Sequence, residues 1–404
     1  MSPKAQPLLP YGRQCVEDDD VAAVTAALKS DFLTTGPLVE DFERAFARRV
    51  EAHHAVACSS GTAALHLAAA ALGLGRNDAV VVPSLTFLAT ANAARYVGAE
   101  ALFADVDAET GLLGAEHVEA ALARAGALRP KAVFAVHLNG HVADMAALGA
   151  VCRKRGLVLV EDASHAVGAT YGANGTRLPV GGCAESAMAT FSFHPVKAIT
   201  TGEGGMVTTN DLALAERLQR LRNHGIERDP RKFTDRAMGF TDGAPNPWYH
   251  EMPEPGWNYR ASDIACALGL SQLGKLDRFL ERRRALASRY DALLAPMAPI
   301  VRPVRRAVSF ESGWHLYPVL IDFDRAGMSR AEVMNQLRAQ GIGTQVHYIP
   351  VHRQPYYRAR YGELGLPGAD AYYARCLSLP LFPAMTDADA TRVVEALSKA
   401  TRRH

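Results

Sequence analysis

Residues 190–205 read TFSFHPVKAITTGEGG, so a short run rich in β-forming residues leads to Lys197 and a glycine-rich turn follows. In this setting a lysine can be held in a buried pocket, where desolvation lowers its pKa and frees the amine as a nucleophile. Such an amine can bond to a carbonyl carbon as a Schiff base. A surface lysine beside a strand turn explains the stretch equally well, so other parts of the sequence must decide.

The size and composition of the chain restrict what it can be. With 404 residues it is long enough for two domains, or for a large α/β domain with a smaller companion. Its formal net charge of +2 gives no reason to expect nucleic acid or an acidic membrane as a partner. Its cysteines form no CxxC pair, and we find neither a signal peptide nor an apolar run of membrane-spanning length. We expect a soluble cytoplasmic protein with reduced thiols.

Short apolar segments alternate with helical patterns up to residue 222. Strands are expected at 55–58, 79–82, 101–106, 132–136, 157–160 and 206–209. The alternation predicts a largely parallel sheet covered by helices on both faces, with ligands beyond the carboxyl ends of its strands. Asp162 lies at such an end, and so does the turn 59–62, SSGT. This turn opens a helix whose free N–H groups can bind an anion, although an ordinary capped helix explains it as well.

The pattern changes toward the C-terminus. The stretch 225–257 is irregular, and loops of this length are usually functional or interfacial. A long helix at 262–290 is expected to link two domains. A smaller α+β domain is predicted by one strand, two helices and an aromatic loop, at residues 314–321, 329–340, 387–399 and 347–357. We therefore expect an α/β protein with a large domain at 1–275, which includes an N-terminal arm, and a small domain at 276–404.

Four features match the requirements of a pyridoxal phosphate (PLP) site. Lys197 can form the Schiff base, and Asp162 can keep the pyridine nitrogen protonated. The turn 59–62 with Ser192 can bind the phosphate, and Phe87 can stack on the ring. Taken singly, Asp162 would be a structural hydrogen-bond acceptor and Phe87 a core residue. Because the four features fall in a consistent order at expected sheet ends, they favour a PLP site.

Four motifs carry a resemblance to a known family: SGTAAL at 60–65, EDASHA at 161–166, SFHPVK at 192–197 with TGEGG at 201–205, and GWNYR at 256–260. Together they resemble the DegT/StrS family of PLP-dependent nucleotide-sugar aminotransferases, and the resemblance runs over residues 12–397. It implies fold type I, the aspartate-aminotransferase fold. That fold has a large domain with a mostly parallel seven-stranded sheet and a smaller C-terminal α+β domain.

The resemblance also implies catalytic roles by position. Lys197 would be the Schiff-base lysine and the proton shuttle, and Asp162 would pair with the pyridinium nitrogen. His165 stands where many relatives place glutamine, near the cofactor's phenolic oxygen. This departure leaves the proton state of that oxygen open.

Further positions would bind the cofactor. The resemblance implies that Gly61, Thr62 and Ser192 hold the phosphate and that Phe87 stacks on the ring. Asn258 matches the residue that reaches the phosphate of the neighbouring subunit's cofactor, which implies a homodimer with shared active sites. The glycines after the lysine would let the backbone pass close to the cofactor.

Within the family, several segments resemble the transaminases of the pseudaminic-acid pathway, which form UDP-4-amino-4,6-dideoxy-N-acetyl-β-L-altrosamine. These segments are PSLTF at 83–87, HPVK at 194–197, WYHEM at 248–252, HYIPVH at 347–352 and QPYY at 354–357. The finer resemblance implies transfer of an amino group from L-glutamate to C4 of a UDP-linked 4-keto-6-deoxy-N-acetylhexosamine. Other keto-sugars stay open: a dTDP-linked sugar, a 3-amino product or a UDP-4-keto-pentose.

Thr35, His347, Tyr348 and His352 are the candidate substrate-binding residues, although a plain turn at 35–37 explains Thr35 equally well. A metal site at the two histidines is disfavoured, because no third ligand accompanies them and Pro350 interrupts any helix between them. We therefore predict no metal.

The sequence disfavours two other functions. A sugar 3-dehydratase of the same fold would have histidine in place of Lys197 and would need an iron–sulfur cysteine cluster. A regulatory homologue without chemistry is disfavoured by the intact Lys197, Asp162 and phosphate turn.

Overall fold

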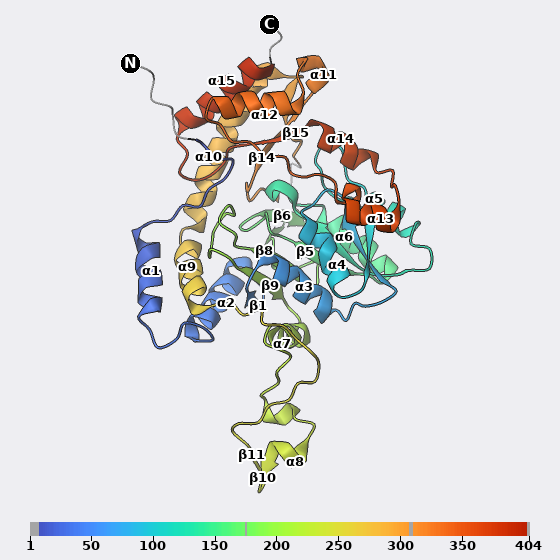
Figure 1. The fold of residues 1–404 in the computed structure, drawn as a ribbon, viewed down its shortest axis with the longest axis vertical. Coiled ribbons are helices and arrows are strands. Elements are labelled where there is room, and N and C mark those ends of the chain that lie inside the picture. The colour runs from blue at the N-terminus through green and yellow to red at the C-terminus, as the bar shows by residue number, and fades with distance from the viewer. Residues whose placement is uncertain (1–7, 174–175, 307–309, 402–404) are drawn as a thin grey trace.

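The computed structural model describes residues 8–173, 176–306 and 310–401, and its centre is a seven-stranded sheet (Figure 1). The strand order is β1-β9-β8-β5-β4-β2-β3. β9 runs antiparallel to β1 and β8, and the other neighbouring pairs are parallel. The mostly parallel sheet predicted from the sequence is therefore confirmed. Its strands are β1 (His54–Cys58), β2 (Asp78–Pro83), β3 (Glu100–Ala104), β4 (Arg129–Val136), β5 (Val158–Asp162), β8 (Met188–Ser192) and β9 (Gly205–Thr209).

Helices cover both faces of this sheet, because successive residues of a strand point to opposite sides. Val80 and Val82 of β2 enter one core, and Ala79 and Val81 enter the other. The first core is closed by α3 (Gly61–Ala71), α4 (Leu88–Tyr96) and α7 (Leu212–Leu221). The second is closed by α2 (Pro37–Val50), α5 (Ala115–Leu122) and α6 (Met145–Arg155). Both cores are dominated by aliphatic residues, as the near-continuous apolar strands require.

The single long helix expected at 262–290 is wrong. The structure has two helices instead, α9 (Asp263–Leu273) and α10 (Leu276–Leu294), with a break at Gly274 and Lys275. Glycine has a low helix propensity. The Lys275 amine also forms ion pairs, each at 2.7 Å, with Asp19 and Asp20 of α1 (Asp18–Leu28). The break therefore lies where α1 is attached to the body of the protein.

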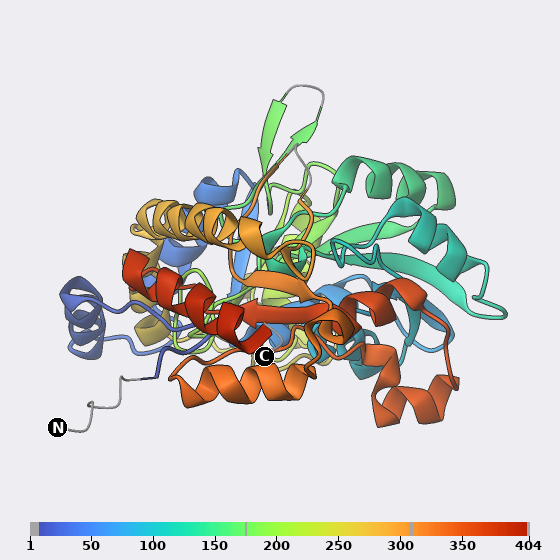
Figure 2. The same ribbon diagram turned by 90° about the horizontal axis from the view of Figure 1, so that it is seen from above.

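The C-terminal part forms a third core around a small antiparallel sheet, β12 (Val301–Pro303), β14 (Tyr317–Ile321) and β15 (Cys376–Leu379). The second half of α10 packs here with α12 (Arg330–Ala339) and α15 (Asp387–Thr401). Figure 2 looks down on this part, drawn in orange and red. It is an α+β arrangement, as expected, and the boundary at residue 276 stays a prediction.

Two segments connect the small core with the large one. Leu9, near the N-terminus, pairs with Ile342 beside the third core. In the other direction, Val351, Tyr357 and Tyr372 pack in the core of the large sheet that contains α3 and α4. The segment before Val351 is thereby brought over the carboxyl ends of the strands.

Residues 225–257 form an arm that projects from the body, at the bottom of Figure 1. Its elements are η2 (Pro230–Lys232), α8 (Arg236–Gly239), β10 (Phe240–Thr241) and β11 (Ala244–Pro245). Met238, Trp248 and Met252 on this arm are 62–73% exposed. The irregular character predicted for this stretch is confirmed.

The remaining elements are β6 (Thr170–Ala173), β7 (Thr176–Pro179), β13 (Phe310–Glu311), α11 (Phe323–Ala326), α13 (Pro355–Tyr361), α14 (Pro367–Arg375) and the short 3-10 turns η1 (Leu138–Gly140), η3 (Ala295–Met297) and η4 (Val351–Arg353). Among the described residues, no helix combines the length and the apolar composition needed to cross a membrane.

Candidate active site

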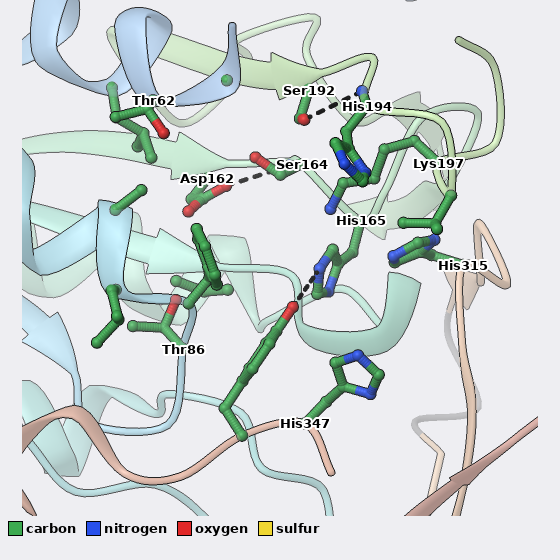
Figure 3. A pocket seen from close by; sticks show the side chains of 18 of the residues that line it. Thr62, Thr86, Asp162, Ser164, His165, Ser192, His194, Lys197, His315 and His347 are labelled. Atoms are coloured by element: carbon green, nitrogen blue, oxygen red, sulfur yellow. Dashed lines mark hydrogen bonds between the residues drawn. The ribbon is translucent and has the colours of Figure 1, made fainter. Parts of the chain in front are cut away.

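The candidate active site is a cavity of about 640 Å³ at the carboxyl ends of the parallel strands. β5 ends at Asp162 and β8 at Ser192, and the pairing of these strands sets Asp162 opposite Thr190. The turn between β1 and α3 brings Gly61 against Ser192. Figure 3 shows Asp162, Ser192 and Lys197 around this cavity.

A short loop after β8 holds Lys197 in the cavity. The Lys197 N–H donates to the His194 carbonyl at 2.9 Å, and the Thr201 N–H donates to the Phe193 carbonyl at 3.0 Å. Within the described ranges, the Lys197 amine has no hydrogen bond or ion pair. Burial lowers the pKa of this amine from 10.5 to about 8, and the negative charge of Asp162 partly opposes the shift. The amine is therefore half neutral, and nucleophilic, near pH 8.

The Asp162 carboxylate is held by a chain of hydroxyl groups. Thr90 Oγ1 donates to Asp162 Oδ2 at 2.6 Å, and the Ser164 N–H donates to Oδ1 at 3.1 Å. Because Thr90 gives its only proton to Asp162, Thr86 must donate in the 2.8 Å contact between the two threonine hydroxyls. The carboxylate is 4% exposed, and an ionised carboxylate at this depth requires a cationic partner. A protonated pyridine nitrogen meets that requirement.

The turn that opens α3 suits a phosphate group. Ser60 caps the helix by accepting from the Ala63 N–H at 3.0 Å, and the first N–H groups of a helix have no intrahelical acceptor. A Cβ at Gly61 would lie 2.6 Å from Ser192 Cβ, so glycine lets the helix start reach the end of β8. A Cβ at Gly205 would lie 2.3 Å from the Ser60 carbonyl oxygen. At Gly205 the close neighbour is thus the backbone of the turn at 59–62, and the close approach of these glycines to the cofactor stays a prediction.

One wall of the cavity consists of imidazole and phenol rings. The His165 ring centroid lies 4.4 Å from that of His315, and the His347 ring meets the Tyr348 ring edge-on at 4.8 Å. Burial and the charge of Lys197 lower the pKa of His165 and His315 well below 6.5, and that of His347 to about 3. The three imidazoles are therefore uncharged at neutral pH.

The structure brings most of the predicted site residues together. Those that line the cavity are Gly61, Thr62, Phe87, Asp162, His165, Ser192, Lys197, His347 and Tyr348. Thr35, Asn258 and His352 do not line it in a single chain. Thr35 and Asn258 are exposed, whereas His352 is buried with its Nδ1 2.5 Å from Ser84 Oγ.

Sequence reasoning missed three residues of the site. Thr86 and Thr90 are four positions apart after a strand end, a spacing that places side chains together at a helix start, so this pair was detectable. His315 has no comparable signal. Its backbone is held by the fully buried Arg283, whose Nη1 donates to the carbonyls of Trp314 and His315 at 3.1 and 3.2 Å.

A desolvated lysine, a buried carboxylate that has no ion pair with the described residues, and a glycine-dependent phosphate turn fit PLP. On this sheet they define a PLP-dependent enzyme of fold type I. The comparison with known proteins agrees. The model of the DegT/DnrJ/EryC1/StrS aminotransferase family matches residues 14–398. The chain belongs to this family and is a PLP-dependent sugar aminotransferase, so the resemblance seen in its motifs is confirmed.

Individual relatives match over nearly the whole chain. The spore coat polysaccharide biosynthesis protein SpsC of Bacillus subtilis (strain 168) is 38% identical over 400 residues, which is 98% of each chain. Spr1654 from Streptococcus pneumoniae, described as a candidate sugar aminotransferase, matches with TM-scores of 0.86 and 0.85 in its PMP and PLP forms, at 26% identity over 98% of each chain. Helicobacter pylori PseC, described as an aminotransferase involved in the biosynthesis of pseudoaminic acid, has a TM-score of 0.85 and 27% identity, covering 98% of this chain and 99% of its own.

Replacing Gly61 by alanine is expected to weaken PLP binding about tenfold or more. The new Cβ would overlap Ser192, and overpacking of one methyl group costs about 1–3 kcal/mol. Absorbance titration of the apoprotein with PLP measures the effect. Gly75→Ala is the matched control, since a Cβ there has no neighbour within 4 Å. Equal affinity of the two variants would contradict the role of the turn.

The Lys197 amine is expected to react with trace acetic anhydride with a midpoint near pH 8. Below this pH the amine is protonated and unreactive, and above it the neutral amine predominates. Competitive labelling of the apoprotein, read by peptide mass spectrometry, gives the midpoint of each lysine. Lys275 is the internal control, because its ion pairs with Asp19 and Asp20 raise its pKa above 10.5. Asp162→Asn should lower the Lys197 midpoint further. A Lys197 midpoint at or above that of Lys275 would refute the desolvation argument.

Proposed function

We propose that the enzyme transfers the amino group of L-glutamate to C4 of a UDP-linked 4-keto-6-deoxy-N-acetylhexosamine, in a pathway of the pseudaminic-acid type. The observation that carries this proposal is the position of the segments with the finer resemblance. Phe87 of one such segment and His347 and Tyr348 of another line the same cavity. The Phe87 and Tyr348 rings are neighbours there, with their centroids 5.9 Å apart. The likeness to PseC supports the same substrate class.

Each residue of the site has a separate role in the proposed reaction. When bound, PLP supplies a carbonyl carbon for Lys197 and a ring that accepts electrons. The Lys197 amine would take the proton from the donor's Cα and would later give a proton to the sugar carbon. Asp162, fixed by Thr90, keeps the ring nitrogen protonated. The start of α3 at Gly61 would hold the phosphate through its free N–H groups.

We further propose a homodimer in which each subunit completes the other's active site. Asn258 is exposed and lies outside its own chain's cavity, which is what a residue serving a partner requires. Phe87 is 54% exposed although it lines the cavity, and Trp248 on the projecting arm is 73% exposed. Large apolar side chains that are exposed to solvent in this way indicate an interaction surface. We place the reaction in the cytoplasm, where unpaired thiols such as those of this chain persist.

The substrate is tested with a panel of keto-sugars. Enzyme converted to its aminated form by glutamate is mixed with UDP-linked and dTDP-linked 4-keto-6-deoxy sugars, a 3-keto sugar and a UDP-4-keto-pentose. We expect the UDP-linked N-acetylhexosamine to react at least tenfold faster than the others, and its product to carry the new amine at C4 by mass spectrometry and NMR. Lys197→Ala is the inactive control. A strict preference for a dTDP-sugar would refute the substrate assignment and leave the aminotransferase intact.

Shared active sites are tested by mixing two inactive variants, Lys197→Ala and Asn258→Ala. In a mixed dimer, one site has the intact Lys197 of one chain and the intact Asn258 of the other. Random exchange makes half of the dimers mixed, so about a quarter of the wild-type activity should return. If Asn258 served its own chain, mixing would restore nothing.

A further inference from the structure

The structure fixes which nitrogen of His165 carries the proton. The backbone N–H of Asn139 points at His165 Nδ1, with a distance of 3.2 Å between the two nitrogens. A backbone N–H can only donate, so Nδ1 must accept and cannot bear a proton. Burial keeps the ring neutral, as its lowered pKa also indicates, and a neutral imidazole has one proton. That proton is therefore on Nε2.

The Nε2–H of His165 in turn fixes the hydroxyl of Tyr348. Nε2 lies 3.0 Å from Tyr348 Oη, and because Nε2 bears the proton, the hydroxyl oxygen is the acceptor. The Tyr348 proton is then left to donate elsewhere. In the described parts of the chain it has no acceptor, and Tyr348 lines the cavity. The dashed line that ends at the His165 ring in Figure 3 marks this hydrogen bond, and the labelled His347 ring lies nearby.

The turn that carries the Asn139 N–H, the first donor in this series of hydrogen bonds, is rigid. Asn139 has a φ of 64° and is followed by Gly140 with a φ of 93°. The Asn139 side chain donates to Tyr372 Oη at 3.0 Å. A Cβ at Gly140 would lie 2.7 Å from the Trp314 N, so this turn is pressed against the segment that carries His315. The direction of the Asn139 N–H is thereby set by packing on both sides.

We propose that Tyr348 is a hydrogen-bond donor to an oxygen atom of a ligand in the cavity, positioned by the Asn139 amide through the His165 tautomer. The acceptor is an oxygen with a free lone pair. Two bound groups can supply it: the carbonyl oxygen of the keto-sugar, which rests on the proposed function, or the phenolic oxygen of PLP. Tyr348 acts as a donor and not as a base, because burial and the nearby charge of Asp162 raise the pKa of its phenol.

Tyr348→Phe removes the hydroxyl and keeps the ring that contacts Phe87 and His347. Three measurements are made on it: the pH titration of the bound cofactor's absorbance without sugar, the half-reaction with glutamate, and the half-reaction with keto-sugar. A shift of about one pH unit in the absorbance titration assigns the acceptor to PLP. An unchanged titration with at least about a tenfold loss confined to the keto-sugar half-reaction assigns it to the sugar. Changes below twofold in all three would overturn the proposal.

Tyr361→Phe is the matched control. It also removes a partly buried phenol, but this hydroxyl donates to Glu100, and Tyr361 does not line the cavity. It should leave all three measurements unchanged. Because the titration and the glutamate half-reaction need no sugar, a wrong choice of sugar would show as inactivity of the wild type itself and is distinguished from failure of the Tyr348 proposal.

The positioning step is tested by two replacements of His165. The amide of glutamine can reach the Nε2 position and donate to Tyr348, whereas asparagine reaches only the Nδ1 position. We expect His165→Asn to reproduce the defect of Tyr348→Phe and His165→Gln to retain most of the wild-type behaviour. In the Tyr348→Phe background His165→Asn should add less than a twofold effect. Multiplicative effects would show that His165 acts independently and would overturn the positioning role.

The tautomer itself is read by ¹⁵N NMR of histidine-labelled apoprotein, with His165→Gln used to assign the signal. The expected spectrum has a protonated Nε2 and an unprotonated Nδ1 in His165. A proton on Nδ1 would overturn the proposal without reference to any ligand.

Discussion

The burial of the Lys197 amine, which forms no hydrogen bond or ion pair with the described residues, is the constraint on which this site depends. The lowering of the pKa from 10.5 to about 8 corresponds to a loss of roughly 3 kcal/mol in the stability of the ammonium form, compared with a lysine in water. The rest of the cavity is consistent with this. His165, His315 and His347 are held neutral by burial and by the lysine's own charge, so the wall beside the amine adds hydrogen-bonding capacity without adding charge. The charge of Asp162 raises the pKa of the amine, and the Thr90 hydroxyl holds this carboxylate in place.

The sheet explains why these groups converge. The parallel pairing of β5 with β8 sets Asp162 opposite Thr190, and Lys197 follows within one short loop. β9 then runs antiparallel beside β8. At Gly205 its backbone lies so close to the phosphate turn that a Cβ there would be 2.3 Å from the Ser60 carbonyl oxygen. The same glycine therefore serves both the lysine loop and the phosphate turn. A side chain at this position would separate the two halves of the cofactor site.

These relations decide how much could be predicted from the sequence. Lys197, Asp162 and Gly61 each follow an apolar strand, and carboxyl ends of parallel strands share one edge, so their convergence could be predicted from the order of elements. His315 could not be found in this way, because it depends on a buried Arg283 that joins carbonyls of two distant segments. The break between α9 and α10 was missed for a similar reason, since ion pairs from Lys275 to α1 add to the weak local signal of Gly274. The hydrophobic periodicity of the sequence indicates which side of a helix or strand is apolar, but not which distant segment packs against it.

The same distinction separates the chemistry of this enzyme from its choice of sugar. The groups that act on any amino donor are attached to strand ends and to the start of α3, where backbone hydrogen bonds fix them. The groups on the opposite side come from irregular segments. Tyr348 is oriented by hydrogen bonds that run from the Asn139 N–H through His165. Phe87 lies at the start of α4. A change of one residue in such a segment can redirect a hydrogen bond without disturbing the lysine or the carboxylate. The cofactor and the reaction class can therefore be predicted from short motifs, whereas the proposed choice of sugar also depends on the tertiary contacts that orient Tyr348 and Phe87.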